Sequence, residues 1–172
     1  MIIKNGSNTM EHDNINARPW VRYWARYIDM YYMAALIIML QKIFFPTRQL
    51  DLNIATVGMY IIWILLEAQL LATWGTTPGK WLLKTKVRDA NNNKLSLKTA
   101  LSRAFLVWFM GLGMTVLSPI TEVVAYSELV NNGVTAWDKR LNCNVIHEDF
   151  GSERIPLIVG AIMLPLFVIG YL

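Results

Sequence analysis

Long apolar runs dominate the pattern of this chain. A helix needs about 20 predominantly apolar residues to cross a bilayer. Three runs meet that length, at residues 27–45, 54–73 and 155–172. The first two contain three charged residues between them, and the third contains none. The pattern therefore predicts three transmembrane helices.

A fourth apolar run, residues 104–130, is interrupted by Gly111, Gly113 and the pair Ser118-Pro119. At a rise of about 1.5 Å per residue, it makes either one long helix or the two short arms of a hairpin that enters the membrane and returns. The predicted fold class is an all-α transmembrane helical bundle of about four membrane segments, one of them a broken helical hairpin.

The polar stretch between the runs 54–73 and 104–130 has a different pattern, in which apolar and polar residues alternate as they do in a β-strand. Residues 82–88 and 94–97 alternate apolar and polar positions, and residues 89–93 are rich in asparagine, which tolerates turn geometry. They predict a small cytoplasmic β-hairpin at the membrane surface. Residues 143–146 can add a third strand. The chain must then return to the cytoplasmic side before that strand, which favours the hairpin form of residues 104–130.

Composition supports a membrane protein and excludes several other classes. Hydrophobic residues make up 55% of the chain and charged residues only 16%, whereas about a quarter of a soluble domain is charged. One cysteine rules out an intrachain disulfide, and two histidines leave little material for a metal or haem site. No nucleophile motif is recognisable, and a net charge of +4 is too small to indicate nucleic-acid binding. We therefore expect that the protein is not an enzyme and that it binds no cofactor, metal or nucleic acid.

Basic residues near the spans predict the orientation, because cytoplasmic loops carry an excess of lysine and arginine. The turn between the first two runs has only Arg48. The other basic residues near these runs either precede the first run or follow the second: Lys4, Arg18, Arg22, Arg26, Lys80, Lys84, Lys86, Arg88, Lys94, Lys98 and Arg103. We expect a multi-pass protein of a prokaryotic inner (plasma) membrane with a cytoplasmic N-terminus. Its expected parts are a polar segment (1–19), a membrane domain (20–148) with a cytoplasmic loop (74–103), and a linker with the last transmembrane helix (149–172).

Charged residues inside the apolar runs are the candidate functional residues. Arg22, Arg26 and Asp29 are spaced by four and three, so they share one helix face. An ionised carboxylate at the depth of Asp29 costs about 2.5–3.5 kcal/mol unless it is paired. Arg26, one turn back, is its expected partner, and Arg22 is expected to bind lipid phosphates or a partner helix.

Two further acids extend this set. Glu67 lies in the second run, and Glu122 lies at a similar depth if residues 104–130 form a hairpin. With Asp29 they would share the cytoplasmic third of the bilayer, close to Arg103. Such carboxylates can exchange a proton for a cation or hold a polar ligand. The competing interpretation is an ion-pair cluster that only locks the helices together, and the chain's shortness and lack of an inverted repeat weigh against transport.

Four motifs, in order, resemble the RDD family of membrane proteins, which is named for one arginine and two aspartates. Arg22 and Asp29 match its opening, Thr77-Pro78-Gly79-Lys80 its central segment, Arg103 its later basic residue, and Trp137-Asp138-Lys139-Arg140-Leu141 its late aspartate motif. The resemblance covers about residues 19–146. From the residues themselves, we expect the central segment to form a turn with Lys80 at the lipid headgroups, and Asp138 and Arg140 to lie at the membrane surface.

The resemblance implies transport of a small ligand, and cation/proton antiport is its most concrete form. The expected partners are the lipid bilayer, a monovalent cation and a proton. The alternative is an accessory or assembly subunit that stabilises another membrane protein or a second copy of itself. The uncharged last helix, outside the resemblance, suits that alternative.

Overall fold

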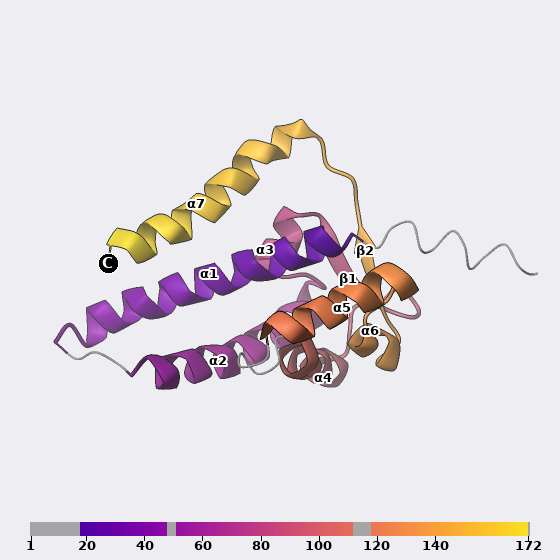
Figure 1. Ribbon diagram of the computed structural model, residues 1–172, viewed down its shortest axis with the longest axis horizontal. Coiled ribbons are helices and arrows are strands. Elements are labelled where there is room, and N and C mark those ends of the chain that lie inside the picture. Colours follow the sequence, from indigo (N-terminus) through magenta and orange to yellow (C-terminus); the bar gives the residue numbers. More distant parts are fainter. Residues whose placement is uncertain (1–17, 48–50, 112–117, 172) are drawn as a thin grey trace, which may run out of the picture.

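Three long helices form the body of the molecule. The computed structural model describes residues 18–47, 51–111 and 118–171. Helices α1 (Pro19–Phe44) and α2 (Leu52–Thr73) are long and apolar enough to cross a membrane, by length and composition. The same holds for α7 (Ile155–Tyr171) together with the 3-10 turn η4 (Ser152–Arg154) that precedes it. The three long helices run lengthwise beside one another, and the short elements gather where α1 begins and α2 ends (Figure 1). The three predicted spans are therefore confirmed as helices.

Local signals explain where two of these helices begin. Pro19 occupies the first turn of α1, where its missing N–H costs nothing and its fixed φ suits the helix. The Asp51 carboxylate caps α2 by accepting hydrogen bonds from the backbone N–H of Asn53 at 2.9 Å and of Ile54 at 3.2 Å.

The fourth apolar run forms two short helical arms and not one long helix. Helix α4 (Leu97–Leu106) continues into a π-helical turn, η2 (Val107–Gly111), and α5 (Ser118–Asn132) brings the chain back. The hydroxyl of Thr121 in α5 donates to the carbonyl of Gly111 at 3.3 Å. At about 1.5 Å per residue, an arm of 15 residues falls short of a hydrocarbon core of about 30 Å. A pair of short helices therefore takes the place of the fourth predicted segment.

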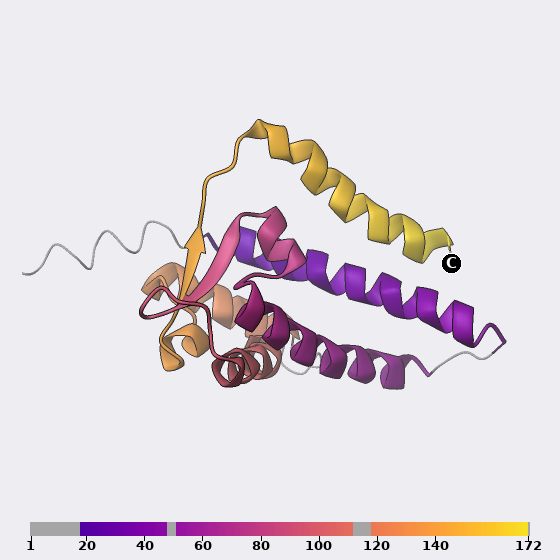
Figure 2. The ribbon, with the colours of Figure 1, turned by 180° about the vertical axis from the view of Figure 1, so that it is seen from behind.

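The β-element pairs differently from the prediction. Strand β1 (Thr85–Asp89) pairs antiparallel with β2 (Cys143–His147), with Val87 opposite Val145. Both strands lie at the end of the molecule where α1 begins (Figure 2). The sheet has two strands within the described residues, so the predicted hairpin within the loop is wrong.

A helix cap explains the error. The Ser96 hydroxyl accepts from the backbone N–H of Thr99 at 3.1 Å, so residues 94–97 lead into α4 and do not form a strand. The predicted turn is confirmed: Asp89 Oδ1 accepts from the N–H groups of Asn91 at 2.9 Å and Asn93 at 2.7 Å, and Asn92 has a φ of +62°.

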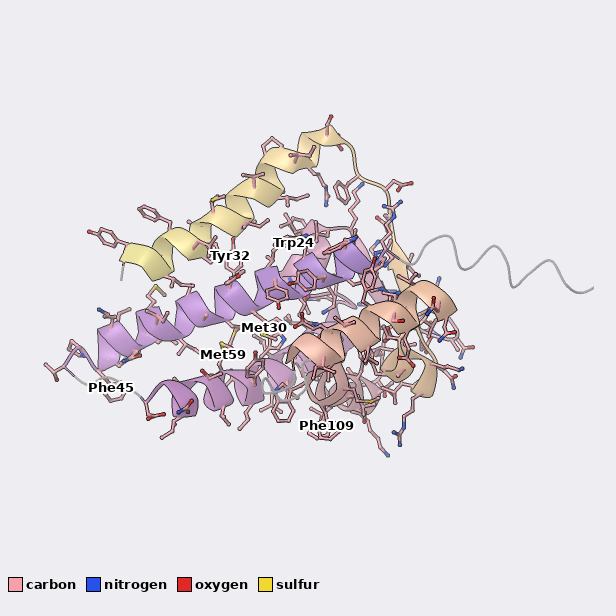
Figure 3. The ribbon with its side chains drawn as sticks, in the orientation of Figure 1. Trp24, Met30, Tyr32, Phe45, Met59 and Phe109 are labelled. Carbon is pink, nitrogen blue, oxygen red and sulfur yellow. The ribbon has the colours of Figure 1, made fainter. Side chains whose placement is uncertain are left out.

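Two apolar clusters attach the short elements to the long helices. One joins the end of α2 to the sheet and α4; its buried members are Ala68, Leu71, Val87, Leu95, Ala100 and Cys143. The other joins α1 to α3 (Pro78–Leu82) and α7; its members are Ala25, Ile28, Leu82 and Leu83, with Ile158, Ala161 and Ile162 of α7 against them. Large side chains such as Trp24, Phe45 and Phe109 remain exposed on the outside, as suits a lipid-facing surface (Figure 3).

Candidate functional site

Buried charged and hydroxyl side chains gather at the end of the bundle where α1 begins and α2 ends. Those that are nearly inaccessible are Asp29, Glu67, Thr77, Lys80, Thr85, Arg103, Thr135 and Asp138. A charge in such surroundings is costly unless it is paired and hydrogen-bonded. The contacts of each therefore decide what this end of the molecule can do.

Asp29 is bound by the start of α3 and not by Arg26. Its carboxylate, 2% exposed, accepts from the Thr77 hydroxyl at 2.5 Å and from the Gly79 N–H at 2.6 Å. The segment comes this close because Gly79 has no side chain: a Cβ there would lie 2.2 Å from the carbonyl oxygen of Ala25. The predicted Asp29–Arg26 pair is wrong, because α3 packs against α1 and supplies neutral donors instead.

A chain of ion pairs continues from α3 into the bundle. Lys80 Nζ lies 2.7 Å from Glu67 Oε1 and 3.3 Å from the Thr77 hydroxyl. Arg103 Nη1 lies 3.8 Å from the same Glu67 oxygen. Lys80 is only 8% exposed, so its predicted place at the headgroups is wrong. The contact between α3 and α1 turns its side chain inward, toward Glu67.

Asp138 joins the first helix to the fourth. Helix α6 (Ala136–Arg140) carries Asp138, which accepts from Arg103 Nε at 2.8 Å and from the Thr135 hydroxyl at 2.9 Å. Arg22 Nη1 lies 3.2 Å from Asp138 Oδ2, the oxygen that also accepts from Thr135, whereas Arg103 binds Oδ1. Asp138 is therefore buried between two arginines and is not a surface group. Of the two alternatives for Arg22, a partner helix is confirmed, because Arg22 binds Asp138 of α6. We refer to the linked side chains as the charge cluster: Arg22, Asp29, Glu67, Lys80, Arg103 and Asp138.

His147, in β2, lies beside the charge cluster. Its Nε2 accepts from Arg22 Nε at 3.2 Å, and its Nδ1 lies 3.1 Å from the Thr85 hydroxyl. Burial, with the positive charges of Arg22 and Arg18, lowers the pKa of His147 to about 4. The imidazole is therefore neutral at physiological pH, with its proton on Nδ1.

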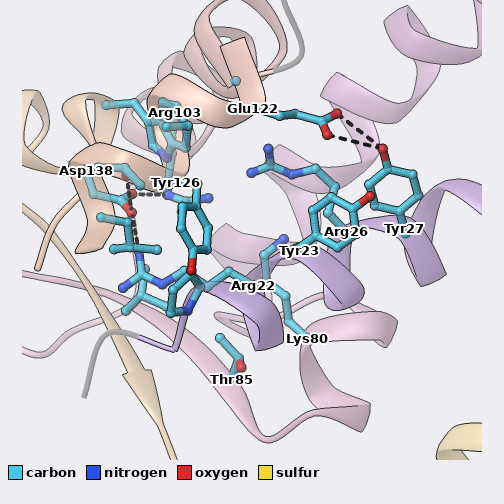
Figure 4. Close-up of a pocket in the computed structure, with 17 residues that line it drawn as sticks. Arg22, Tyr23, Arg26, Tyr27, Lys80, Thr85, Arg103, Glu122, Tyr126 and Asp138 are labelled. Atoms are coloured by element: carbon cyan, nitrogen blue, oxygen red, sulfur yellow. Dashed lines mark hydrogen bonds and ion pairs between the residues drawn. The ribbon is translucent and has the colours of Figure 1, made fainter. Parts of the chain in front are cut away.

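A cavity of about 100 Å³ opens beside the charge cluster (Figure 4). Its walls come from helices α1, α3, α4, α5 and α6, from the end of η2 and from the strands β1 and β2. The charged lining residues are Arg22, Arg26, Lys80, Arg103, Glu122 and Asp138, and the aromatic ones are Tyr23, Tyr27, Tyr126 and Trp137. The Tyr27 hydroxyl donates to Glu122 at 3.2 Å, and the guanidinium of Arg26 lies over the Trp137 ring, 5.8 Å from its centre.

Residues 16–172 match the RDD family of membrane proteins. The chain belongs to the RDD family. The match extends beyond the motifs that end near residue 146 and includes α7. No curated protein and no solved structure matches the chain.

The RDD motifs, far apart in the sequence, meet in space. Arg22 and Asp138 are in direct contact at 3.2 Å, and Asp29, two turns along α1, binds the Thr77–Lys80 segment. Arg103 bridges Glu67 and Asp138. These residues of the RDD protein thus form a continuous polar connection between α1, α2, α3, α4 and α6.

Other predicted site residues lie outside this connection. Of the three predicted carboxylates, Glu122 lines the cavity, whereas Asp29, bound to Thr77 and Gly79, and Glu67, bound to Lys80, are not among the lining residues. Pro78 starts α3 with an exposed ring, and Arg140 is exposed at the end of α6.

The sequence analysis missed Thr85, Thr135 and His147. Thr135 precedes Asp138 by three residues, a spacing typical of a helix cap, and could have been found. No sequence signal indicates Thr85 or His147, because their contacts depend on the pairing of β1 with β2.

Proposed function

We propose that this RDD protein moves a small polar solute across the membrane and that the cavity beside the charge cluster is its binding site. One observation carries the proposal: a cavity lined by charged groups opens at one end of a bundle whose long helices are otherwise apolar. Charges that only lock helices together are expected to be fully packed against their partners. Here Arg26 and Glu122 face a space large enough for a ligand.

A polar solute suits this lining better than a metal cation. Lys80 and Arg103 lie against Glu67, and Arg22 and Arg103 against Asp138, so a cation would have to displace positive side chains to reach either carboxylate. Glu122 is the cavity carboxylate that a tyrosine hydroxyl binds. Glu122 is therefore the carboxylate that would bind the proton and the monovalent cation in turn in an exchange of the two.

Transport by purified protein in liposomes tests the proposal. Uptake of radiolabelled serine, succinate and inorganic phosphate would be measured, with an internal pH dye to report exchange of protons for Na⁺ or K⁺. We expect uptake of at least one solute above protein-free liposomes, lost in Arg26→Gln and kept in Arg140→Gln. Background uptake of all three by folded wild-type protein would contradict the proposal, and a proton signal lost in Glu122→Gln would favour cation exchange instead.

The accessory role is the second candidate, and α7 is the feature that favours it. One face of α7 packs against α1 and α3 through Ile158, Ala161 and Ile162. Most of its other side chains are exposed and are available to lipid or to another membrane protein. Stoichiometric co-purification of a partner, or of a second copy, in mild detergent together with background flux would support this role.

A further inference from the structure

The cavity has more positive groups at its wall than negative ones. Four of its lining residues are cations, Arg22, Arg26, Lys80 and Arg103, and two are acids, Glu122 and Asp138. Asp29 and Glu67 balance the formal charge of the region, but they lie outside the cavity lining. The cavity itself therefore presents a local excess of hydrogen-bond donors and positive charge.

The acids near the cavity are already bound to hydrogen-bond donors or cations of the protein itself. Asp138 accepts from two arginines and a threonine hydroxyl, and Glu67 is in contact with Lys80 and Arg103. Both oxygens of Glu122 lie within 3.5 Å of the Tyr27 hydroxyl. None of these carboxylates forms an ion pair with Arg26, among the residues that the structure describes.

Arg26 is the lining cation that has no carboxylate within ion-pair distance in the described part of the chain, although Glu67, Asp138 and Glu122 are close enough to attract its charge. A guanidinium has five N–H donors, and its contact within the described residues is with the face of Trp137. Gly111 leaves room for it, since a Cβ there would lie 3.1 Å from Arg26 Nη1. Arg22, Arg26 and Arg103 extend toward the same space from two helices (Figure 4). In addition, Arg103 Nη1 is buried without a hydrogen-bond acceptor in the described part of the chain.

We propose that the cavity binds a phosphate group, with Arg26 as the primary ligand. The planar fork of a guanidinium matches the oxygens of phosphate, and converging cations suit a group with several charged oxygens better than a single carboxylate. The inference deepens the proposed function, on which it rests for the site, by naming the chemical class of the ligand. The group can belong to a soluble phosphorylated compound or to the headgroup of an anionic lipid.

Calorimetric titration of inorganic phosphate into the full-length protein, in an uncharged detergent at constant ionic strength, tests the inference directly. We expect saturable binding that Arg26→Gln weakens about tenfold or more, a change that corresponds to about 1.4 kcal/mol. Arg26→Lys, which keeps the charge but loses the fork, should restore part of it. Arg140→Gln, an exposed site away from the cavity, should bind like the wild type.

A second experiment shows whether the phosphate group belongs to a lipid headgroup or to a soluble compound. Native mass spectrometry would compare retention of phosphatidylglycerol and phosphatidylcholine by the wild type and Arg26→Gln. Selective, Arg26-dependent retention of phosphatidylglycerol identifies a lipid headgroup; phosphate binding that this lipid does not displace identifies a soluble ligand.

Several outcomes would overturn the inference. They are no phosphate binding and no Arg26-dependent lipid retention by the folded wild type, succinate binding in place of phosphate, or unchanged affinity in a folded Arg26→Gln protein. Phosphate binding without flux would retain the inference and reject transport. Flux of serine without phosphate binding would do the reverse.

Discussion

Glu67 shows most directly why single residues matter in this bundle. It is a buried carboxylate on an apolar helix, and it forms ion pairs with Lys80 at 2.7 Å and with Arg103 at 3.8 Å. Among the described residues Lys80 has no other ion-pair partner, whereas Arg103 also pairs with Asp138. Removing one member of a buried ion pair leaves the other charge uncompensated in surroundings where water cannot reach it. Without Glu67, Lys80 would lose its ion-pair partner and would face the positive charge of Arg103, which keeps its ion pair with Asp138.

Glu67→Ala should therefore destabilise the protein by about 3–5 kcal/mol, the usual cost of breaking a buried ion pair. Thermal unfolding in detergent, followed by tryptophan fluorescence, measures the change. Glu148→Ala is the matched control, because Glu148 pairs with Lys86 on the exposed side of the sheet and its loss should change little. Equal unfolding temperatures for the two variants would show that Glu67 is dispensable.

His147 makes stability depend on pH. Its pKa of about 4 lies below the ordinary value of 6.5, so between these values the unfolded chain binds a proton that the folded chain does not. The free energy of unfolding should therefore fall as the pH drops from 6.5 toward 4, and His147 should contribute no such change above 6.5.

NMR titration of labelled histidine in a His12→Gln background, which leaves one histidine signal, measures this pKa directly. The slope of unfolding temperature against pH should also flatten in His147→Gln. A titration midpoint near 6.5 in the folded protein would contradict the buried, arginine-flanked environment.

Among the helices and strands, α3 is short but supplies contacts to two buried carboxylates. It has only five residues, yet it supplies the donors to Asp29 and the lysine to Glu67. Its position depends on close backbone approach to α1, which the glycine at position 79 permits.

Gly79→Ala should separate α3 from α1, because the new Cβ meets the backbone oxygen of Ala25, which cannot move aside without bending α1. A loss of about 1–3 kcal/mol or more is expected, as for other overpacked sites. Gly58→Ala is the control, since a Cβ at that helical position meets nothing within 4 Å. Unfolding measured under the same conditions should show a loss for Gly79→Ala alone; similar stability of both variants would argue against this packing.

Two elements show how local patterns can mislead. The alternation of residues 94–97 is a strand pattern only four residues long, and the Ser96 cap of α4 overrides it. The run 104–130 is apolar enough for one long helix, but the short arms bring Asp138 back to Arg103. In both cases a cap or a distant ion pair decided between alternatives that hydropathy left open.

At the scale of the molecule, the arrangement predicts which ends share a side of the membrane. Helix α4 and the end of α5 lie at the end of the bundle where α1 begins and α2 ends, and the turn after α1 lies at the opposite end (Figure 1). With Cys143 replaced by alanine, Lys98→Cys and Asn132→Cys should react with an impermeant maleimide only after cells are permeabilised. Thr47→Cys should react in intact cells. Opposite accessibility of Lys98→Cys and Asn132→Cys would contradict the hairpin.

The amino-acid sequence was sufficient to predict the three long helices, the family motifs and the buried charges inside the apolar runs, Asp29 and Glu67. These properties follow from the composition of single segments, because burial in lipid requires a continuous apolar stretch and makes each charge within it stand out. The tertiary structure alone decided the partners: Thr77 and Gly79 for Asp29, Lys80 for Glu67, and β2 for β1. Ion pairs and strand pairing join residues that are far apart in the chain. For each buried carboxylate the sequence offers several lysines and arginines as partners, and it does not indicate which of them binds. Only the packing of α3 and α6 onto the long helices selected among them and left Arg26 facing the cavity.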